Sequence, residues 1–249
     1  MPFPGILGRI CDHPCEERCK RNLVGGSIAI GALERLCVEK YAGKKRVQPL
    51  PRKSQRIAVL GGGLSGVTSA LDLLKKGFAV SLFEAADRLG GALWDLPEEL
   101  LPRAVITEDL AVLEALRADI QLGVQLDKKL FDRVCEEYDA VIIDRDSANG
   151  IDFSLELDDD GLIAITPATG ATNREKVFAG GGTRLRGCFS PVMETLEGRK
   201  PALSIERLMQ KVSLEFGREG EGSYNSRLYT SLEGIDPVPR VVPADTAKG

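Results

Sequence analysis

The chain lacks the features that mark several large classes of protein. Its formal net charge of −4 leaves no excess of positive charge for binding nucleic acid. No uninterrupted apolar run approaches the roughly 20 residues that a membrane-spanning helix needs. The first residues, MPFPGILGRICDHP, contain no basic region followed by an apolar core, so we expect no secretory signal. We therefore expect a cytoplasmic protein with neither a nucleic-acid nor a membrane partner.

Histidine is scarce, and cysteine is too sparse for a disulfide framework. His13 is the only histidine, and we expect it in a loop or a cap, because haem and zinc sites usually need more ligands. The chain has six cysteines in 249 residues, and three of them, Cys11, Cys15 and Cys19, are crowded together. That crowding favours metal chemistry.

The crowded cysteines form a C-x3-C-x3-C pattern. Pro14 suits the first position of a helix, so the sequence predicts Cys15 and Cys19 on one helical face and Cys11 on the preceding loop. Three thiolates fit an iron–sulfur centre, which commonly takes four ligands, and a fourth is not evident. Cys37 lies on an apolar helical stripe and is interpreted as core filling rather than as a ligand.

A glycine-rich turn is the strongest motif of the chain. Residues 56–83 predict a strand, a glycine turn, an amphipathic helix and a second strand. Gly61, Gly63 and Gly66 fit G-x-G-x-x-G, and Glu84 follows about 20 residues on, where a carboxylate can accept hydrogen bonds from a ribose. This combination predicts adenine-dinucleotide binding. The alternative is an ordinary turn in which glycine supplies a positive φ.

Alternating elements continue after this unit and predict a doubly wound parallel sheet. The expected elements are helices at 107–118, 130–137 and 191–212, strands at 120–126, 138–143 and 177–182, and a hairpin at 155–165. Trp94 is interpreted as packing rather than as a cover for a cofactor, and Cys135 and Cys188 as ordinary thiols. We expect a helical cysteine-bearing segment (1–43), a linker (44–55), a Rossmann-like domain (56–212) and an extended tail (213–249).

Several of these motifs together resemble one family. They are GRICDHPCEERC, SIAIGALER, the unit from AVLGGGLSG to LFEAADRLGG, YDAVII, and KVFAGGG followed by METLEGRKPA. Over roughly residues 3–209 the chain resembles the small (β) subunit of glutamate synthase and the matching flavin domain of dihydropyrimidine dehydrogenase. The resemblance implies an α/β fold, with a doubly wound Rossmann-like FAD-binding domain and a short N-terminal ferredoxin-like cluster segment. It also implies electron transfer among NADPH, FAD and 4Fe–4S clusters.

The resemblance also implies the site residues. FAD would lie across the glycine turn, with its adenosine ribose at Glu84 and its ribityl chain and flavin near the segment from Ala179 to Gly182 and the start of the last helix. The expected cofactor-binding residues are Gly61, Gly63, Leu64, Ser65, Gly66, Glu84, Arg88, Gly90, Gly91, Leu93, Leu126, Gly181, Gly182, Pro191 and Val192. Cys11, Cys15 and Cys19 would be 4Fe–4S ligands in the intact system. No catalytic acid or base is expected, because the flavin carries the redox chemistry.

The chain departs from the family pattern at several positions. Only residues 144–176 lie where the family has its NADPH-binding domain, so that domain is expected to be absent. Asp144-Arg145-Asp146 replaces Ala-Thr-Gly, Gly182 replaces an aspartate that binds the flavin side, and Leu100 replaces an arginine near the flavin. Leu7 stands where a further cysteine is common. The resemblance therefore implies a fragment or a pared-down subunit.

Two functions follow from this pattern. The first is a flavoprotein electron-transfer module, in which FAD passes electrons between iron–sulfur centres or to a partner subunit. The alternative is a non-catalytic structural subunit with a degenerate flavin site. A third possibility, that the glycine turn holds NADH, is disfavoured because Gly90-Gly91 and the VFAGGG segment match the flavin pattern.

Overall fold

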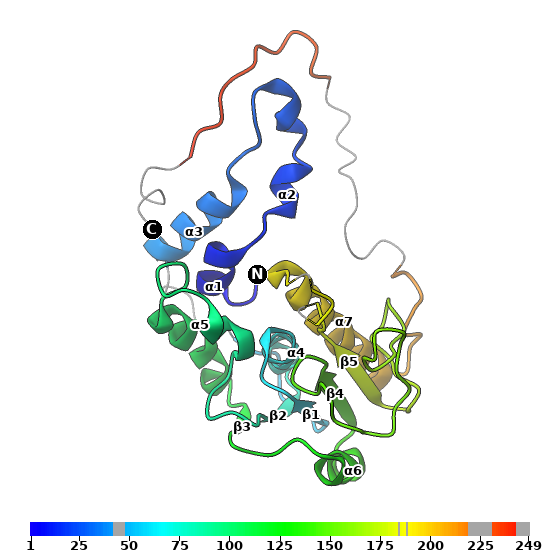
Figure 1. The fold of residues 1–249 in the computed structure, drawn as a ribbon. Helices are drawn as coiled ribbons and strands as arrows, with labels where there is room; N and C mark the ends of the chain where they lie inside the picture. The colour runs from blue at the N-terminus through cyan, green and yellow to red at the C-terminus, as the bar shows by residue number, and fades with distance from the viewer. Residues whose placement is uncertain (42–47, 184, 188, 219–230, 243–249) are drawn as a thin grey trace.

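A five-stranded parallel sheet forms the centre of the protein. The computed structural model describes residues 1–41, 48–183, 185–187, 189–218 and 231–242. The strands lie in the order β3-β2-β1-β4-β5, and every neighbouring pair is parallel (Figure 1). Their bounds are β1 Arg56–Leu60, β2 Ala79–Phe83, β3 Asp119–Gln121, β4 Ala140–Asp144 and β5 Val177–Gly180. The α/β fold expected from the sequence is confirmed.

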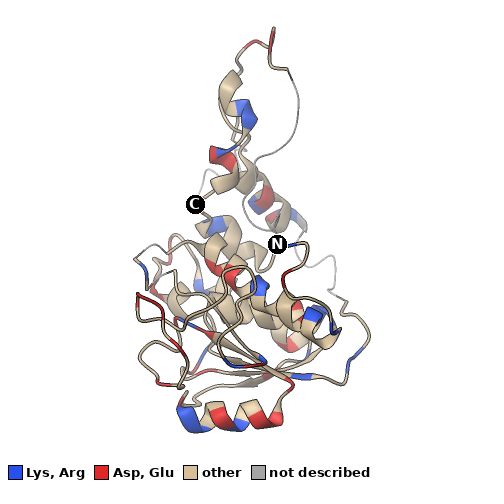
Figure 2. Cartoon of the chain, turned by 90° about the vertical axis from the view of Figure 1, so that its right-hand side faces the viewer, with Lys and Arg blue, Asp and Glu red and all other residues tan. Residues whose placement is uncertain are grey.

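Helices cover both faces of this sheet. Successive residues of β1 point to opposite faces, so Ile57 and Val59 enter one apolar core while Ala58 and Leu60 enter the other. The first core includes helices α4 Leu64–Lys75, α5 Arg103–Ala115 and α7 Pro191–Met209. A single helix, α6 Lys128–Glu137, packs in the second core, and Figure 2 shows mixed charges along it. The sheet is therefore wound on both sides.

The N-terminal segment is anchored to the first core by its first helix. The segment consists of α1 Pro4–Ile10, α2 Pro14–Glu17, the 3-10 helix η1 Lys20–Val24 and α3 Ile30–Tyr41. Ile6 of α1 is fully buried, and its backbone N–H donates to Asp109 Oδ2 on α5 at 2.8 Å. Helix α3 packs on α1 in turn. The cysteine-bearing residues after α1 therefore start from a fixed position.

The described part of the C-terminal tail lies against this N-terminal segment. Residues 231–242 contain no helix or strand and arch over α2 and α3 (Figure 1). The Val238 N–H donates to the Val24 carbonyl at 3.0 Å, and Arg240 donates to Ser27 Oγ at 2.8 Å and to Glu16 Oε2 at 2.5 Å. The described tail thus contacts the part of the N-terminal segment between Glu16 and Ser27. The division into four segments stays a prediction.

Two predictions about cysteines in this segment are wrong. Helix α2 ends at Glu17, so Cys15 and Cys19 do not share a helix. The Asn22 side chain explains the early end, because its Nδ2 donates to the carbonyls of Glu16 and Glu17 at 2.9 and 3.2 Å and takes acceptors that a longer helix would use.

Cys37 was interpreted as core, and it is exposed. Helix α3 instead turns Gly31 inward, where a Cβ would lie 2.1 Å from the His13 ring, and packs the backbone of Arg35 against Gly8 of α1. The packed face of α3 is therefore set by contacts with α1 and His13 and not by its apolar stripe.

Other elements differ in length from the prediction. The strand expected at 120–126 ends at Gln121, because Gly123 turns the chain with a φ of 67°. The hairpin expected at 155–165 is reduced to one antiparallel bridge between Leu157 and Ile163, around a turn at Asp158. The helix expected at 107–118 spans Arg103–Ala115. Among the described residues no helix is both long and apolar enough to cross a membrane.

Helices α4 and α7 approach each other closely at Gly198. A Cβ on Gly198 would lie 2.3 Å from the Ser65 carbonyl oxygen, and the Ser69 hydroxyl donates to the Gly198 carbonyl at 2.7 Å. This contact holds α7 at Gly198 against the first turn of α4, with no room for a side chain between the two helices.

Gly198→Ala is therefore expected to lower the free energy of unfolding by about 1–3 kcal/mol, because backbone must move to admit the methyl group. Gly8→Ala is the matched control, since its Cβ would meet Arg35 at an ordinary 3.4 Å. The control should leave stability unchanged or raise it by up to ~1 kcal/mol. Urea unfolding measures both, and equal stabilities for the two variants would contradict the close contact.

Candidate functional site

The glycine turn joins β1 to α4 through close backbone contacts. Gly61 has a φ of 103°, and its N–H donates to the Phe83 carbonyl of β2 at 2.8 Å. A Cβ on Gly66 would lie 2.1 Å from the Gly61 carbonyl oxygen. The first glycine of the G-x-G-x-x-G pattern thus allows the sharp turn, and the third lets the helix touch the end of the strand. The N-terminus of α4 consequently faces the space beyond the carboxyl ends of the strands.

Glu84 is fixed beside this turn at the carboxyl end of β2. Its side chain is buried, with Oε2 accepting from the Gly62 N–H at 2.5 Å and Oε1 accepting from the Ala86 N–H at 2.8 Å. Each carboxylate oxygen keeps a second lone pair. The carboxylate is therefore held in place and can still accept hydrogen bonds from a pair of hydroxyl groups.

A second glycine segment lies against the turn. The Gly90 N–H donates to the Gly62 carbonyl at 2.7 Å, and a Cβ on Gly91 would lie 3.2 Å from the Cα of Gly63. Both glycines have positive φ, 110° and 48°. This arrangement lets two stretches of bare backbone border the same space.

The remaining predicted residues of this region are placed differently. Arg88 is exposed and lies over the Trp94 ring at 4.3 Å, while Trp94 Nε1 donates to the Leu89 carbonyl. Leu93 is buried in the first core and Leu126 in the second, beneath α6. Both leucines therefore pack in the apolar cores, and the assignment of Arg88, Leu93 and Leu126 to the cofactor site stays a prediction.

Leu64 and Ser65 begin α4 beside the turn, and Pro191 and Val192 begin α7. Gly181 and Gly182 follow β5 with φ of 79° and 95°. These residues come from the ends of three elements. All of them lie at the edge where the parallel strands end, which is where open α/β sheets bind ligands.

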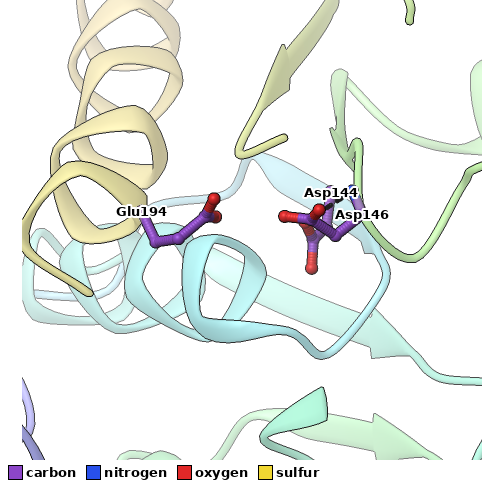
Figure 3. Close-up of side chains that lie close together, drawn as sticks. All are labelled: Asp144, Asp146 and Glu194. Atoms are coloured by element: carbon purple, nitrogen blue, oxygen red, sulfur yellow. Dashed lines mark hydrogen bonds between the residues drawn. The ribbon is translucent and has the colours of Figure 1, made fainter. Parts of the chain in front are cut away.

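Three carboxyl side chains gather at this edge (Figure 3). One oxygen each of Asp144, Asp146 and Glu194 lies within 4.8 Å of the others. Asp144 ends β4, Asp146 follows it, and Glu194 lies in the first turn of α7. A Cβ on Gly63 would lie 2.2 Å from Asp144 Oδ2, so this carboxyl group covers the second glycine of the fingerprint. We call Asp144, Asp146 and Glu194 the acid cluster.

Sequence reasoning missed the acid cluster. From the sequence alone, Asp144-Arg145-Asp146 indicates only a loss of polar contacts with a flavin. The available signal was positional, because residues that follow β4 and that open a helix after β5 meet at the same edge of a parallel sheet. Nothing in the sequence places Glu194 beside Asp146, since they lie far apart along the chain.

Neighbouring donors satisfy part of the acid cluster. Asp146 Oδ2 accepts from the Gly182 N–H at 2.9 Å, and Asp144 Oδ2 accepts from the Ser147 hydroxyl at 3.1 Å. Glu194 Oε1 accepts from both the N–H and the hydroxyl of Thr183. Asp146 Oδ1 is buried without a hydrogen-bond partner. Asp144 Oδ1 accepts from the Asp146 N–H at 3.3 Å. These donors to the cluster are all uncharged N–H and hydroxyl groups.

Burial and mutual repulsion raise the proton affinity of this cluster. Burial raises the pKa of Asp144 well above its usual range, and the charges of Asp146 and Glu194 raise it further. Burial also raises the pKa of Glu194 to about 7, with Asp146 adding to the rise and the Thr183 hydrogen bonds opposing it. The cluster consequently retains protons at pH values where exposed carboxyl groups are ionised.

The predicted cluster cysteines show no shared single-ion site. Cys15 is exposed, whereas Cys11 and Cys19 are partly buried, and burial raises the pKa of the Cys11 and Cys15 thiols. Within the described ranges no three cysteine sulfurs lie within 4.8 Å of one another. The assignment of these residues to an iron–sulfur cluster stays a prediction. Cys188 lies outside the described residues.

Comparison with known proteins supports the resemblance. A model of the NAD(P)-binding Rossmann-like domain matches residues 59–96. The chain is 27% identical over 168 residues to the NADPH-Fe(3+) oxidoreductase subunit beta of Geobacter sulfurreducens, covering 65% of this chain and 25% of that protein. It is 31% identical over 149 residues to the glutamate synthase [NADPH] small chain of Bacillus subtilis, covering 57% of this chain and 30% of that protein.

These matches confirm the resemblance to the glutamate synthase small subunit and relate the chain to oxidoreductase subunits. The chain spans only 25% and 30% of the length of these two relatives. Among solved structures, a thioredoxin reductase from Gloeobacter violaceus aligns with a TM-score of 0.46 and 8% identity, over 64% of this chain and 96% of that one. That likeness carries no functional information.

The raised pKa of Glu194 makes stability depend on pH. Between about pH 4.5 and about pH 7, the folded chain holds a proton on Glu194 that the unfolded chain releases. The free energy of unfolding therefore falls as the pH rises through this range. The measurement is made in metal-free buffer. Glu194→Gln cannot ionise and should flatten this fall. Glu197→Gln, on the same helix, should keep it. Urea unfolding across this range measures the slopes, and identical slopes for the wild type and Glu194→Gln would contradict the assignment.

Proposed function

We propose that the chain binds FAD at the glycine turn and serves as an electron-transfer subunit of a larger oxidoreductase. The observation that carries this proposal is the geometry of Glu84. Its carboxylate is held by two backbone N–H groups beside the turn, with free lone pairs directed at no other described residue. That is the position and chemistry at which a Rossmann fold accepts the ribose diol of an adenine dinucleotide.

The residues present fit the two ends of this site differently. Gly61, Gly66 and the N-terminus of α4 form the cradle for a diphosphate, where backbone N–H groups and the helix dipole favour negative charge. Asp144 opposes that charge, because its Oδ2 covers Gly63, the glycine over which the diphosphate would pass. The adenosine half therefore fits as the chain stands. The diphosphate half fits once the charge of Asp144 is neutralised or the side chain turns away.

The roles of the protein residues follow from this placement. FAD, when bound, supplies the redox chemistry, so the chain needs no catalytic acid or base of its own. Glu84 would orient the adenosine ribose, and the backbone of Leu64 and Ser65 would face the phosphates. The bare backbone of Gly90 and Gly91, with Gly181 and Gly182, would border the flavin half. A redox partner subunit or an iron–sulfur protein would exchange electrons with it.

The names of the relatives support an assembly of this kind. The Geobacter protein is a subunit beta, and the Bacillus protein is a small chain. Both are much longer than the matched region. We infer that this chain corresponds to the flavin-holding part of such subunits and works with partners that supply the electron donor and acceptor. The Cys11, Cys15 and Cys19 segment would carry the cluster on the partner-facing side.

A second function has an observation in its favour. The acid cluster fills the edge of the sheet with carboxyl groups, and Asp144 lies where the diphosphate is expected. A structural subunit that has the Rossmann-like fold but binds no cofactor would tolerate such residues. The two functions differ in one measurable property, since a ligand that binds only the native state raises the melting temperature.

FAD titration of the chain tests the first function. We expect saturable quenching of FAD fluorescence with one FAD per chain. Glu84→Gln should weaken binding by about 10- to 150-fold, because a hydrogen bond to a charged group contributes ~1.5–3 kcal/mol. Asp87→Asn, an exposed change in the same loop, should leave the affinity unchanged.

Asp144→Asn separates the two functions in the absence of metal. The amide keeps an acceptor for Ser147 but removes the opposing charge. If FAD lies over Gly63, Asp144→Asn should bind FAD more tightly than the wild type does in metal-free buffer. No quenching and no rise in melting temperature with FAD, in either protein, would contradict the flavin proposal and favour the structural subunit.

A further inference from the structure

We propose that Asp144, Asp146 and Glu194, together with the Ser65 hydroxyl, form a binding site for one divalent cation of the Mg²⁺ class. The site lies between the carboxyl ends of β4 and β5 and the first turns of α4 and α7. Figure 3 shows the three carboxyl groups turned toward one another. The ion site itself does not depend on the proposed function.

Charge gives the first argument. Asp144 and Glu194 are 1% and 2% exposed, and Asp146 is partly buried. In the described part of the chain, no lysine or arginine forms an ion pair with any of the three. Three uncompensated carboxylates are very costly to bury, so either protons or a cation must neutralise them. Asp146 Oδ1 has no hydrogen-bond partner, and either a shared proton or a bound cation would give it one.

An unsatisfied hydroxyl gives the second and independent argument. Ser65 is fully buried, and its Oγ has no hydrogen-bond partner. A Cβ on Gly181 would lie 2.9 Å from Asp144 Oδ1, 3.0 Å from Glu194 Oε2 and 3.1 Å from the Ser65 Cβ. The Ser65 side chain thus lies beside Gly181, together with one carboxyl oxygen each of Asp144 and Glu194. A hydroxyl oxygen is also a suitable ligand for a hard cation, so an ion bound by the carboxyl groups would give the Ser65 hydroxyl a partner.

The donor set identifies the class of ion. All the candidate ligands are oxygens, which suit hard cations such as Mg²⁺, Mn²⁺ and Ca²⁺ and not ions that prefer sulfur or imidazole. Mg²⁺ in particular is commonly held by one or two carboxylates, several waters and the phosphates of a bound nucleotide. Asp144 Oδ2 lies over Gly63, so an ion here would also face the position of a diphosphate.

This position suggests what the ion does. A divalent cation bound by the acid cluster would replace the repulsion between Asp144 and a diphosphate with attraction. The ion would thereby link the acid cluster, on β4 and α7, to the glycine turn through the phosphates of the bound dinucleotide. This second step rests on the proposed function, since it requires the dinucleotide to bind at the turn.

Manganese binding tests the ion site directly. The full chain is treated with a chelator, exchanged into buffer at about pH 8, where carboxylic acids are ordinarily ionised, and titrated with Mn²⁺. Free Mn²⁺ is measured by electron paramagnetic resonance. We expect one Mn²⁺ per chain, competition by Mg²⁺, and an affinity at least ~10-fold lower in Glu194→Gln and in Asp146→Asn. Glu197→Gln, one turn along α7, should bind like the wild type.

Two results would overturn the ion site. One is a wild-type chain that is folded by circular dichroism and binds no Mn²⁺. The other is equal binding by the wild type and by folded Glu194→Gln and Asp146→Asn. If both variants fail to fold, the wild-type stoichiometry and its competition by Mg²⁺ decide. A stoichiometry near zero then means that the cluster holds protons only.

FAD titration of the wild type with and without Mg²⁺ tests the link to the dinucleotide. We expect FAD affinity to rise at least ~10-fold with Mg²⁺, and this rise to be lost in Glu194→Gln. FAD binding that is equally tight with and without the ion would overturn the link while leaving the proposed function standing. Mn²⁺ binding without any FAD binding would overturn the proposed function while leaving the ion site standing.

Discussion

The close approach of backbone around the first turn of α4 brings the polar groups of the site together. Gly66 lets α4 touch the end of β1, and Gly198 lets α7 touch Ser65 on the same turn of α4. Larger residues at these points would separate the elements. Because they are in contact, the carboxyl ends of β1, β2, β4 and β5 and the first turns of two helices surround one small volume. Glu84 lies on one side of that volume and the acid cluster on the other.

The two sides impose opposite electrostatic demands. The Glu84 side offers a fixed carboxylate for hydroxyl groups and a helix N-terminus that favours an anion. The acid cluster side carries three carboxyl groups, of which two are almost fully buried, and raised pKa values for Asp144 and Glu194. A dinucleotide satisfies the first side, and its phosphates oppose the second unless a proton or a cation intervenes. The cofactor and the charge state of the cluster are therefore coupled.

The sequence predicted the parts of this arrangement that depend on neighbours along the chain. The glycine pattern and Glu84 lie within one β-α-β unit, and alternating elements fix a parallel sheet, so both could be found by spacing alone. Predictions failed where individual side-chain and tertiary contacts decide. The Asn22 side chain ends α2 before Cys19, and contacts with α1 and His13, rather than its apolar stripe, orient α3 and leave Cys37 exposed.

The acid cluster was missed for the same reason, because its members meet only in the folded chain. Its presence makes dinucleotide binding the central claim to test. A crystal structure of the chain grown with FAD and Mn²⁺ does so most directly. Our account predicts the adenosine ribose at Glu84, the diphosphate over Gly63, and anomalous density for manganese among Asp144, Asp146 and Glu194. A structure in which the glycine turn holds no nucleotide at saturating FAD would contradict it.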